Sequence, residues 1–255
     1  MNIQMVVPCF NEEHRYDRAY WSELFKIPEI EWLFVNDGSL DGTKELLDDL
    51  KNSYSNVRCI NLLQNVGKGE AIRKGYLDIL NISGERTVLL GQIDFDSSYE
   101  AEDILRIIEI GKTRISKNSF DSIWAARVQL AGRRLQRKKY RNYLSKLIIF
   151  ILRSFIKNLP YDPQTSFKLY NIRDEQKTIF TDSFKTRWFF DIELYLRLKE
   201  INKELKIWEE PIEYVRDVDN SKINNREAYR IIRDLIKIIY ILMQIKLNKN
   251  KLISY

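Results

Sequence analysis

Two aspartates, Asp94 and Asp96, are the residues best placed to do chemistry in this chain of 255 residues. They follow the apolar run 87–90, which predicts a β-strand. Side chains two residues apart in an extended segment point to the same side, so both carboxylates would face one cleft. Such hard oxygen ligands suit a divalent ion that holds a diphosphate. The alternative is an ordinary turn, because aspartate is common where a strand ends.

A second polar turn, 36–43, follows the apolar run 32–35. It contains Asp37 together with glycines, which allow backbone conformations that other residues resist. At the tip of a strand, Asp37 could accept hydrogen bonds from a base or a ribose. The alternative is a turn that binds nothing, in which Asp41 or Thr43 caps the helix that follows.

Strand-like and helix-like segments alternate through the first half of the chain. Apolar runs predict strands at 3–7, 32–35, 57–63 and 87–90, and apolar residues at helical spacing predict helices at 43–50, 69–80 and 101–112. This alternation indicates an α/β fold with a mostly parallel central sheet flanked by helices. Ligands bind at the carboxyl ends of such strands, where the polar loops 8–13, 36–43 and 94–98 lie.

The second half of the chain is richer in helical patterns. A strand is expected at 122–128, and amphipathic helices are expected at 143–159, 188–201 and 227–248. With only 9 glycines and 5 prolines in the chain, no segment has the composition of a long flexible linker. We therefore expect one continuous domain with amphipathic helical additions in its C-terminal half.

Composition excludes several classes of protein. Hydrophobic residues make up 44% of the chain and charged residues 31%, which is a globular composition with enough apolar material for a core. The single histidine, His14, argues against a histidine-rich metal site and a histidine-based catalytic triad. Cys9 and Cys59 lie in apolar runs and are interpreted as reduced core residues of a cytosolic protein.

The N-terminal residues lack the pattern of a secretory signal, and no run reaches the roughly 18 apolar residues of a membrane span. The protein is therefore expected to be soluble or to lie on a membrane surface. Its net charge of +6 is concentrated in basic clusters at 133–141 and 246–251. Such clusters favour phosphates or anionic lipid head groups, and a solvated helix face is the alternative. No nucleic-acid partner is expected, because no recognised binding motif accompanies them.

Four segments, in order, resemble motifs of glycosyltransferase family 2, whose members have the GT-A fold. They are the loop 6–13 (VVPCFNEE), the turn 35–43 (VNDGSLDGT), the segment 65–71 (NVGKGEA) and the triplet 94–96 (DFD). Four ordered motifs are far more specific than any one of them alone. The resemblance implies a Rossmann-like half that binds a nucleotide.

Three later segments are similar to the branch of this family that contains the dolichyl-phosphate glucose and mannose synthases. They are 162–170 (DPQTSFKLY), 187–194 (RWFFDIEL) and 208–223. This resemblance implies inverting transfer of a sugar from a UDP- or GDP-sugar to polyprenyl or dolichyl phosphate at the cytoplasmic membrane face. One alternative is transfer to a saccharide hydroxyl in the synthesis of a surface polysaccharide or glycan. Another is a non-catalytic protein that binds nucleotide sugars, which the Asp94 and Asp96 pair disfavours.

Matching positions imply roles for individual residues. Asp94 and Asp96 would hold Mg²⁺ or Mn²⁺, and Lys222 would offset charge on the departing diphosphate. The residues expected to contact the nucleotide are Pro8, Phe10, Glu12, Asp37, Lys68, Asp94 and Ser221. Arginine binds phosphate through paired hydrogen bonds, and the expected acceptor-binding residues are Arg133, Arg134, Arg137 and Gln164.

The role of Asp191 depends on the acceptor. A hydroxyl must lose a proton, for which Asp191 is the candidate base. A phosphate is already an anionic nucleophile, in which case Asp191 would orient groups instead. Its structural alternative is an N-cap of the helix expected from residue 192 onwards.

The resemblance also implies a division of the chain. A GT-A domain is expected at 1–225, with a nucleotide-binding half at 1–98 and an acceptor-binding half at 99–225, followed by a basic amphipathic helix at 226–255. Apolar residues from Ile231 to Ile245 line one side of that helix, and lysines and arginines decorate the rest. Such a helix either lies in a membrane interface or packs on the protein body. We expect a cytoplasmic protein held peripherally on the inner face of the membrane.

Overall fold

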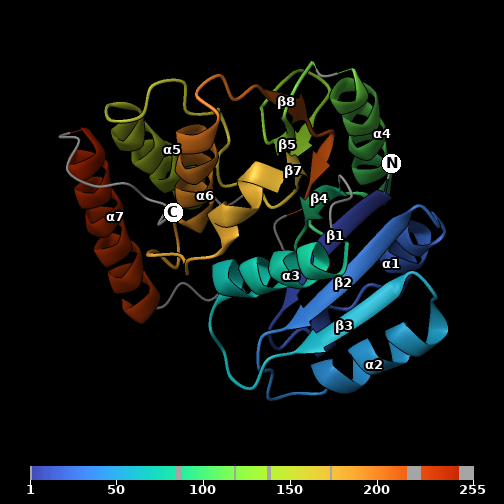
Figure 1. Ribbon diagram of the computed structural model, residues 1–255. Coiled ribbons are helices and arrows are strands. Elements are labelled where there is room, and N and C mark those ends of the chain that lie inside the picture. Colours follow the sequence, from blue (N-terminus) through green and yellow to red (C-terminus); the bar gives the residue numbers. More distant parts are fainter. Residues whose placement is uncertain are drawn as a thin grey trace.

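The computed structural model describes residues 2–83, 88–117, 119–136, 139–172, 174–216 and 225–246. At its centre lies a sheet with the strand order β3-β2-β1-β4-β7-β5-β8 (Figure 1). Its strands are β1 (Asn2–Cys9), β2 (Ile30–Asn36), β3 (Val57–Asn61), β4 (Val88–Gln92), β5 (Ser122–Ala126), β7 (Lys168–Ile172) and β8 (Ile207–Pro211). A separate ribbon pairs β6 (Arg134–Leu135) with β9 (Tyr214–Val215).

The N-terminal half of the sheet is parallel, as the alternating sequence pattern predicts. Strand β1 pairs in parallel with β2 and β4, and β2 pairs in parallel with β3. Strand β7 then runs antiparallel to both of its neighbours, β4 and β5. The sequence does not predict β7 as a strand. The segment begins with a charged residue, Lys168, and lacks the apolar run that is typical of a core strand. The carboxyl ends of β1, β2 and β4 therefore meet at one edge of the sheet.

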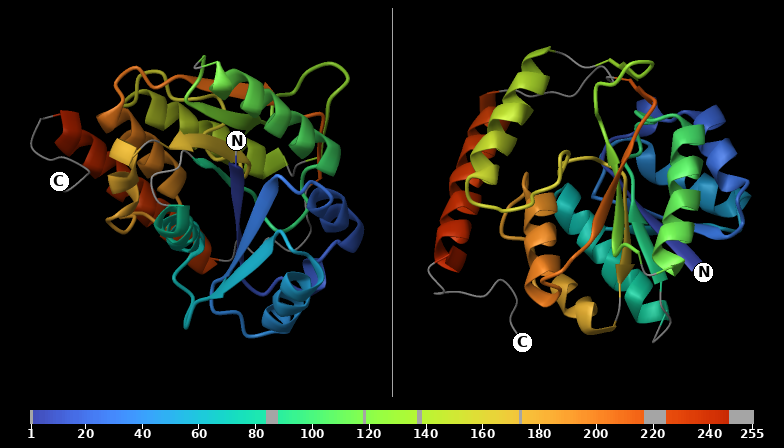
Figure 2. Two further views of the ribbon diagram at one scale, coloured as in Figure 1. Left: turned by 45° about the vertical axis from the view of Figure 1, so that its right-hand side comes forward. Right: turned by 90° about the horizontal axis from the view of Figure 1, so that it is seen from above.

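Helices cover both faces of the sheet, which Figure 2 shows edge-on in its right-hand view. The helices are α1 (Arg18–Phe25), α2 (Thr43–Ser53), α3 (Lys68–Ser83), α4 (Ala101–Ser116), α5 (Lys139–Arg153), α6 (Phe190–Ile201) and α7 (Asn225–Lys246), and two 3-10 turns are η1 (Glu13–Arg15) and η2 (Asp174–Phe180). Buried residues of α1, α2 and α4 share one apolar cluster with the sheet. Buried residues of α3, α5, α6 and α7 share the other.

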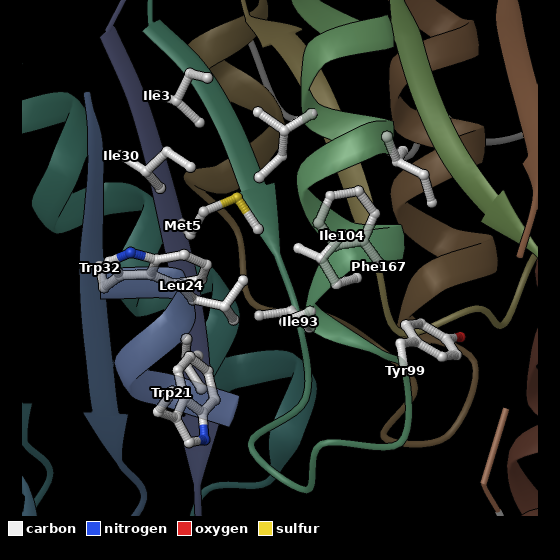
Figure 3. Close-up of a cluster of buried hydrophobic side chains, with 14 of the residues drawn as sticks. Ile3, Met5, Trp21, Leu24, Ile30, Trp32, Ile93, Tyr99, Ile104 and Phe167 are labelled. Atoms are coloured by element: carbon white, nitrogen blue, oxygen red, sulfur yellow. The ribbon is translucent and has the colours of Figure 1, made fainter. Parts of the chain in front are cut away.

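The apolar cluster under α1, part of which Figure 3 shows, also holds the segment that carries the acidic pair. The ring of Trp21 lies 5.6 Å from that of Trp32 and 5.5 Å from that of Phe95. Its indole Nε1 also donates a hydrogen bond of 3.1 Å to the carbonyl of Phe95. Phe95 is fully buried, so its two neighbours, Asp94 and Asp96, are held at the surface of this core.

The C-terminal helix α7 lies against the body of the molecule along one side. Ile231, Ile238 and Leu242, all on the face expected to be apolar, are buried in the cluster with α5 and α6. These three side chains therefore pack on the body, whereas Ile232, expected on the same side, is exposed. A second apolar stripe on α7 stays exposed, and its members are Tyr229, Ile232, Ile236, Tyr240 and Met243. Within the described residues, no helix combines the length and apolar character needed to cross a membrane. The division of the chain into 1–225 and 226–255 stays a prediction.

Candidate functional site

The loops after β1 and β2 are joined by hydrogen bonds into one unit. The amide of Asp37 donates to the carbonyl of Cys9 over 2.8 Å, and the amide of Leu40 donates to Oδ1 of Asn11 over 2.9 Å. The hydroxyl of Thr43 accepts from the amide of Glu12 over 2.7 Å. The polar segments 8–13 and 36–43, expected at one sheet edge, therefore form a continuous rim.

The carboxylate of Asp37 organises the next loop rather than facing open space. Asp37 is buried and accepts hydrogen bonds from the amides of Val66 and Gly67, over 2.7 and 2.8 Å, and from Nδ2 of Asn65 over 3.0 Å. Burial raises the pKa of Asp37, and the two amide hydrogen bonds oppose that rise. The sequence predicts a contact between Asp37 and the nucleotide, and this stays a prediction. In the structure, Asp37 holds the loop 65–67, and α3 begins directly after that loop, at Lys68.

Glycine at position 38 lets this loop approach closely. Gly38 has a φ of +67°, and a Cβ built there would lie 2.6 Å from the backbone carbonyl carbon of Gln64. Any larger residue would strain the backbone and push the loop after β3 away from the turn after β2.

The acidic pair after β4 lies beside Lys68. The Nζ of Lys68 is 2.6 Å from Oδ1 of Asp94, so three of the expected site residues, Lys68, Asp94 and Asp96, meet here. Burial, followed by the nearby charge of Asp94, raises the pKa of Asp96. Strand β4 ends at Gln92, and residues 95–96 form a turn instead of the extended segment expected. Ser97, directly after the pair, has a φ of +47°, which fits a turn and not a continuing strand.

The donor atoms of this pair fit a divalent cation. The negative charges of Asp94 and Asp96 repel each other, and a nearby positive charge relieves that repulsion. The ammonium of Lys68 already supplies one such charge beside Asp94. Among the residues that the structure describes, no group of three or more His, Cys, Asp or Glu side chains could hold a metal. A cation bound by Asp94 and Asp96 would therefore complete its shell with substrate oxygens and water.

The remaining nucleotide-site candidates of the first loop differ in exposure. Pro8 pairs in register with Val35 within the sheet, and the ring of Phe10 is 39% exposed. Glu12 is buried, with its Oε2 lying 2.9 Å from Nε of Arg15. Burial raises the pKa of Glu12 to about 8, and Arg15 opposes that rise. No contact with a nucleotide is tested for these three residues, so their roles stay predictions.

Asp191 forms a buried ion pair that the sequence pattern does not indicate. Its Oδ1 contacts Nζ of Lys168 and accepts a hydrogen bond of 3.3 Å from Nε2 of Gln92. Lys168 is fully buried in β7 and also donates to the carbonyl of Pro163 over 2.8 Å. Burial lowers the pKa of Lys168, against the opposing charge of Asp191. Asp191 is the second residue of α6, and Phe189 occupies the N-cap, so the capping alternative is wrong.

A second ion pair, between half-buried Arg127 and buried Asp162, shapes the loop before β7. The guanidinium of Arg127 holds both carboxylate oxygens of Asp162, each over 2.6 Å, and donates to the carbonyl of Gln164 over 3.0 Å. The side-chain amide of Gln164 donates to the carbonyl of Trp188 over 3.4 Å. Sequence reasoning missed Arg127, because its partner lies 35 residues further along the chain. The acceptor role of Gln164 stays a prediction.

Of the expected acceptor arginines, Arg134 lies in β6 and Arg133 directly precedes that strand. Arg133 pairs with Glu213, with NH1 2.7 Å from Oε1, and Arg134 is exposed in β6. The ribbon adjoins the acidic segment, because Val215 of β9 bridges to Tyr99, three residues after Asp96. Arg137, Ser221 and Lys222 lie outside the described residues. The roles of all these residues stay predictions.

Comparison with known proteins agrees with this geometry. Residues 5–179 match the model of a family described as glycosyl transferase family 2. The dolichyl-phosphate beta-glucosyltransferase ALG5A of Trichomonas vaginalis is 29% identical over 246 residues, covering 92% of this chain and 72% of that protein. The dolichyl-phosphate beta-glucosyltransferase of Dictyostelium discoideum is 26% identical over 252 residues, covering 92% of this chain and 73% of that protein.

Solved structures share the fold at low sequence identity. Glucosyl-3-phosphoglycerate synthase from Mycobacterium tuberculosis, solved with Mn²⁺, UDP and glucosyl-3-phosphoglycerate, has a TM-score of 0.62 at 14% identity, covering 94% of this chain and 79% of that one. The mannosyltransferase PcManGT from Pyrobaculum calidifontis, solved with GDP-Man and Mn²⁺, has a TM-score of 0.61 at 11% identity, covering 98% of this chain and 65% of that one. The fold expected from the sequence is therefore confirmed.

The raised pKa of Glu12 predicts a pH dependence of stability. The unfolded chain loses this proton near pH 4.5 and the folded protein near pH 8, so the folded state binds more protons in between. Stability should therefore fall as the pH rises through this window. Glu12→Gln removes the titrating group and should flatten the decline, as measured by thermal unfolding across the window. Glu45→Gln, at an exposed position of α2, is the control. Identical profiles for Glu12→Gln and the wild type would contradict the assignment.

Proposed function

The chain belongs to glycosyl transferase family 2, and from this premise we propose that it transfers a sugar, with inversion, from a nucleotide diphosphate to polyprenyl or dolichyl phosphate. The observation that carries the proposal is the meeting of Lys68, Asp94 and Asp96 beside the loop that Asp37 holds. The names of the two relatives, both dolichyl-phosphate beta-glucosyltransferases, support the choice of acceptor.

The donor site lies at the edge where β1, β2 and β4 end. Asp94 and Asp96 would hold Mg²⁺ or Mn²⁺, which when bound neutralises the diphosphate as it leaves. Support comes from the crowded charge of the two carboxylates and from the Mn²⁺ in the two similar solved structures. Lys68, at the start of α3, supplies a further positive charge at the same place. Lys222 is proposed to act on the same leaving group.

The ion pair between Asp191 and Lys168 favours a phosphate acceptor over a hydroxyl. A general base needs a free lone pair directed at the proton it removes. Oδ1 of Asp191 is already engaged by Lys168 and Gln92, so this oxygen has no lone pair directed at an acceptor hydroxyl. A phosphate oxygen attacks as an anion and needs no base. Asp191 would then act by orienting groups at the reaction centre.

The reaction that follows is a single displacement. An oxygen of the acceptor phosphate attacks the anomeric carbon from the face opposite the nucleotide. The bond from that carbon to the β-phosphate oxygen breaks, and the electron pair leaves with the nucleoside diphosphate. No proton is transferred in this step. Arg133, Arg134, Arg137 and Gln164 are proposed to hold the acceptor phosphate.

A lipid acceptor requires a surface that meets the membrane. The stripe on α7 exposes Ile232, Ile236 and Tyr240 by 59%, 64% and 60%. Helix α5 exposes Tyr143, Leu147 and Phe150 in the same part of the molecule, the side farthest from α1 and α2 (Figures 1 and 2). Apolar side chains flanked by lysines and arginines suit the interface of an anionic bilayer. We propose that this surface docks the protein peripherally on the cytoplasmic face.

An acceptor assay tests the proposed reaction. With Mn²⁺ and UDP- or GDP-sugars, the purified protein should glycosylate a polyprenyl phosphate and release nucleoside diphosphate in equal amount. The matched acceptors are the corresponding polyprenyl alcohol and a panel of saccharides. Because only the phosphate is already an anionic nucleophile, it alone should be converted. Turnover of saccharides without turnover of the lipid phosphate would replace this proposal with the alternative of glycan synthesis.

The acidic pair is tested by Asp96→Asn, which removes one charge with little change in shape. Turnover should fall at least about 100-fold, since removing preorganised charge at a reacting centre typically costs that much. Half-saturation should also require more Mn²⁺. Asp49→Asn, at an exposed position of α2, is the control and should retain wild-type turnover. Wild-type rates and Mn²⁺ dependence in Asp96→Asn would exclude this cation site.

The membrane surface is tested by flotation with vesicles that contain phosphatidylserine. The triple variant Ile232→Ser, Ile236→Ser, Tyr240→Ser should bind at least about tenfold more weakly than the wild type, because each buried apolar side chain contributes about 1.5–3 kcal/mol. Ile82→Ser changes an isoleucine on α3 of similar exposure, 64%, and should bind normally. Equal flotation of all three proteins, or none by the wild type, would refute this docking surface.

A further inference from the structure

A buried carboxylate, Asp234, joins α7 to the segment before α6. Asp234 is 1% exposed and lies on the inward side of the helix that carries the exposed stripe. Its Oδ2 accepts hydrogen bonds from the backbone amides of Arg187 and Trp188, over 2.8 and 3.0 Å. Its Oδ1 accepts from the guanidinium of Arg233 over 3.0 Å. Two backbone amides thus depend on one side chain of the C-terminal helix.

The side chain of Arg187 continues this connection towards the donor site. Its NH2 donates a hydrogen bond of 2.5 Å to Oδ1 of Asn65. The guanidinium also lies across Gly67, where an added Cβ would stand 2.7 Å from Nε of Arg187. Arg187 is therefore in direct contact with both ends of the loop 65–67, and this loop is the one that Asp37 holds.

Lys68 follows that loop immediately and pairs with Asp94. The contacts therefore run without a gap from α7, through Arg187 and the loop 65–67, to a carboxylate of the proposed cation site. On the other side, the carbonyl of Trp188 accepts from Gln164, and α6 begins two residues later with Phe190. Asp234 thus supports a segment that contacts both the donor side and the acceptor side.

We propose that Asp234 is a positioning residue, which sets the loop 65–67 and the donor site through Arg187 without touching the substrate. This inference rests on the proposed function for the identity of the donor. Loss of the carboxylate leaves two half-buried amides without their acceptor, and the segment at 187–188 is no longer held against α7. The loop then loses the guanidinium that lies over it. Donor binding consequently depends on the helix that meets the membrane.

Two measurements test this role. The first is the affinity for UDP and for GDP with Mn²⁺, and the second is amide exchange at Val66 and Gly67 without any ligand. Asp234→Ala and Arg187→Ala should each weaken nucleotide binding about tenfold and speed exchange at both amides. The double variant should be little worse than either single one, because both changes break the same connection.

Controls separate positioning from a general loss of stability. Asp234→Asn keeps an oxygen that can accept both amides and should restore most of the affinity. Arg233→Ala removes the other partner of Asp234 and should leave affinity and exchange as in the wild type. Vesicle flotation should be unchanged in Arg187→Ala.

Unchanged exchange at Val66 and Gly67 in Arg187→Ala would overturn the proposal, as would additive effects in the double variant. If Asp234→Ala does not fold, Arg187→Ala and Asp234→Asn still decide the question. If the wild type binds neither nucleotide, the proposed function fails, whereas the exchange data still confirm or refute the positioning role.

Discussion

The arrangement of the site depends on one set of hydrogen bonds, which the loop 65–67 donates to the carboxylate of Asp37. Parallel strands place the ends of β1, β2 and β4 at one edge, but a parallel sheet alone does not determine where the loop after β3 lies. Three hydrogen bonds from the loop 65–67 fix it against the end of β2. Because α3 starts directly afterwards, its first residue, Lys68, is brought to Asp94. A buried carboxylate is costly unless its oxygens are satisfied, which makes this geometry strongly preferred over alternatives.

Hydrophobic periodicity was sufficient to predict the parallel half of the sheet and the positions of its polar loops, because both depend on patterns within a few residues. The ordered motifs were sufficient to predict the family. Contacts between distant residues were not predictable in this way. The pairing of Asp191 with Lys168 spans 23 residues and joins two different elements. The partners of Asp37 lie 28 to 30 residues away. Short or irregular elements such as α1 and β7 were also missed, since each presents too few periodic positions.

The C-terminal half of the sheet is organised by ion pairs, whereas hydrogen-bonded loops organise the N-terminal half. Arg127 and Asp162 fix the chain just before β7, and Lys168 within β7 reaches Asp191 on α6. Buried pairs of this kind hold their partners in one place, and each ion would be costly without the other. The antiparallel strand β7 therefore does more than extend the sheet. Through Lys168 it connects the strand beside the acidic pair, β4, with the helix that carries the candidate reaction-centre carboxylate.

Helix α7 carries one set of residues that faces the core and another that faces outward, and the helical repeat fixes the angle between the two sets. Asp234 points inward while Ile232 and Ile236, two residues before and after it on the same helix, point outward. An α-helix advances about 100° per residue, so inserting or deleting one residue inside α7 would rotate everything beyond it by that angle. A single substitution at an outer position changes one side chain, whereas a change in length would turn all the later apolar residues away from the core and from the proposed docking surface. Over evolution, the length of α7 should therefore vary far less than the identity of its residues.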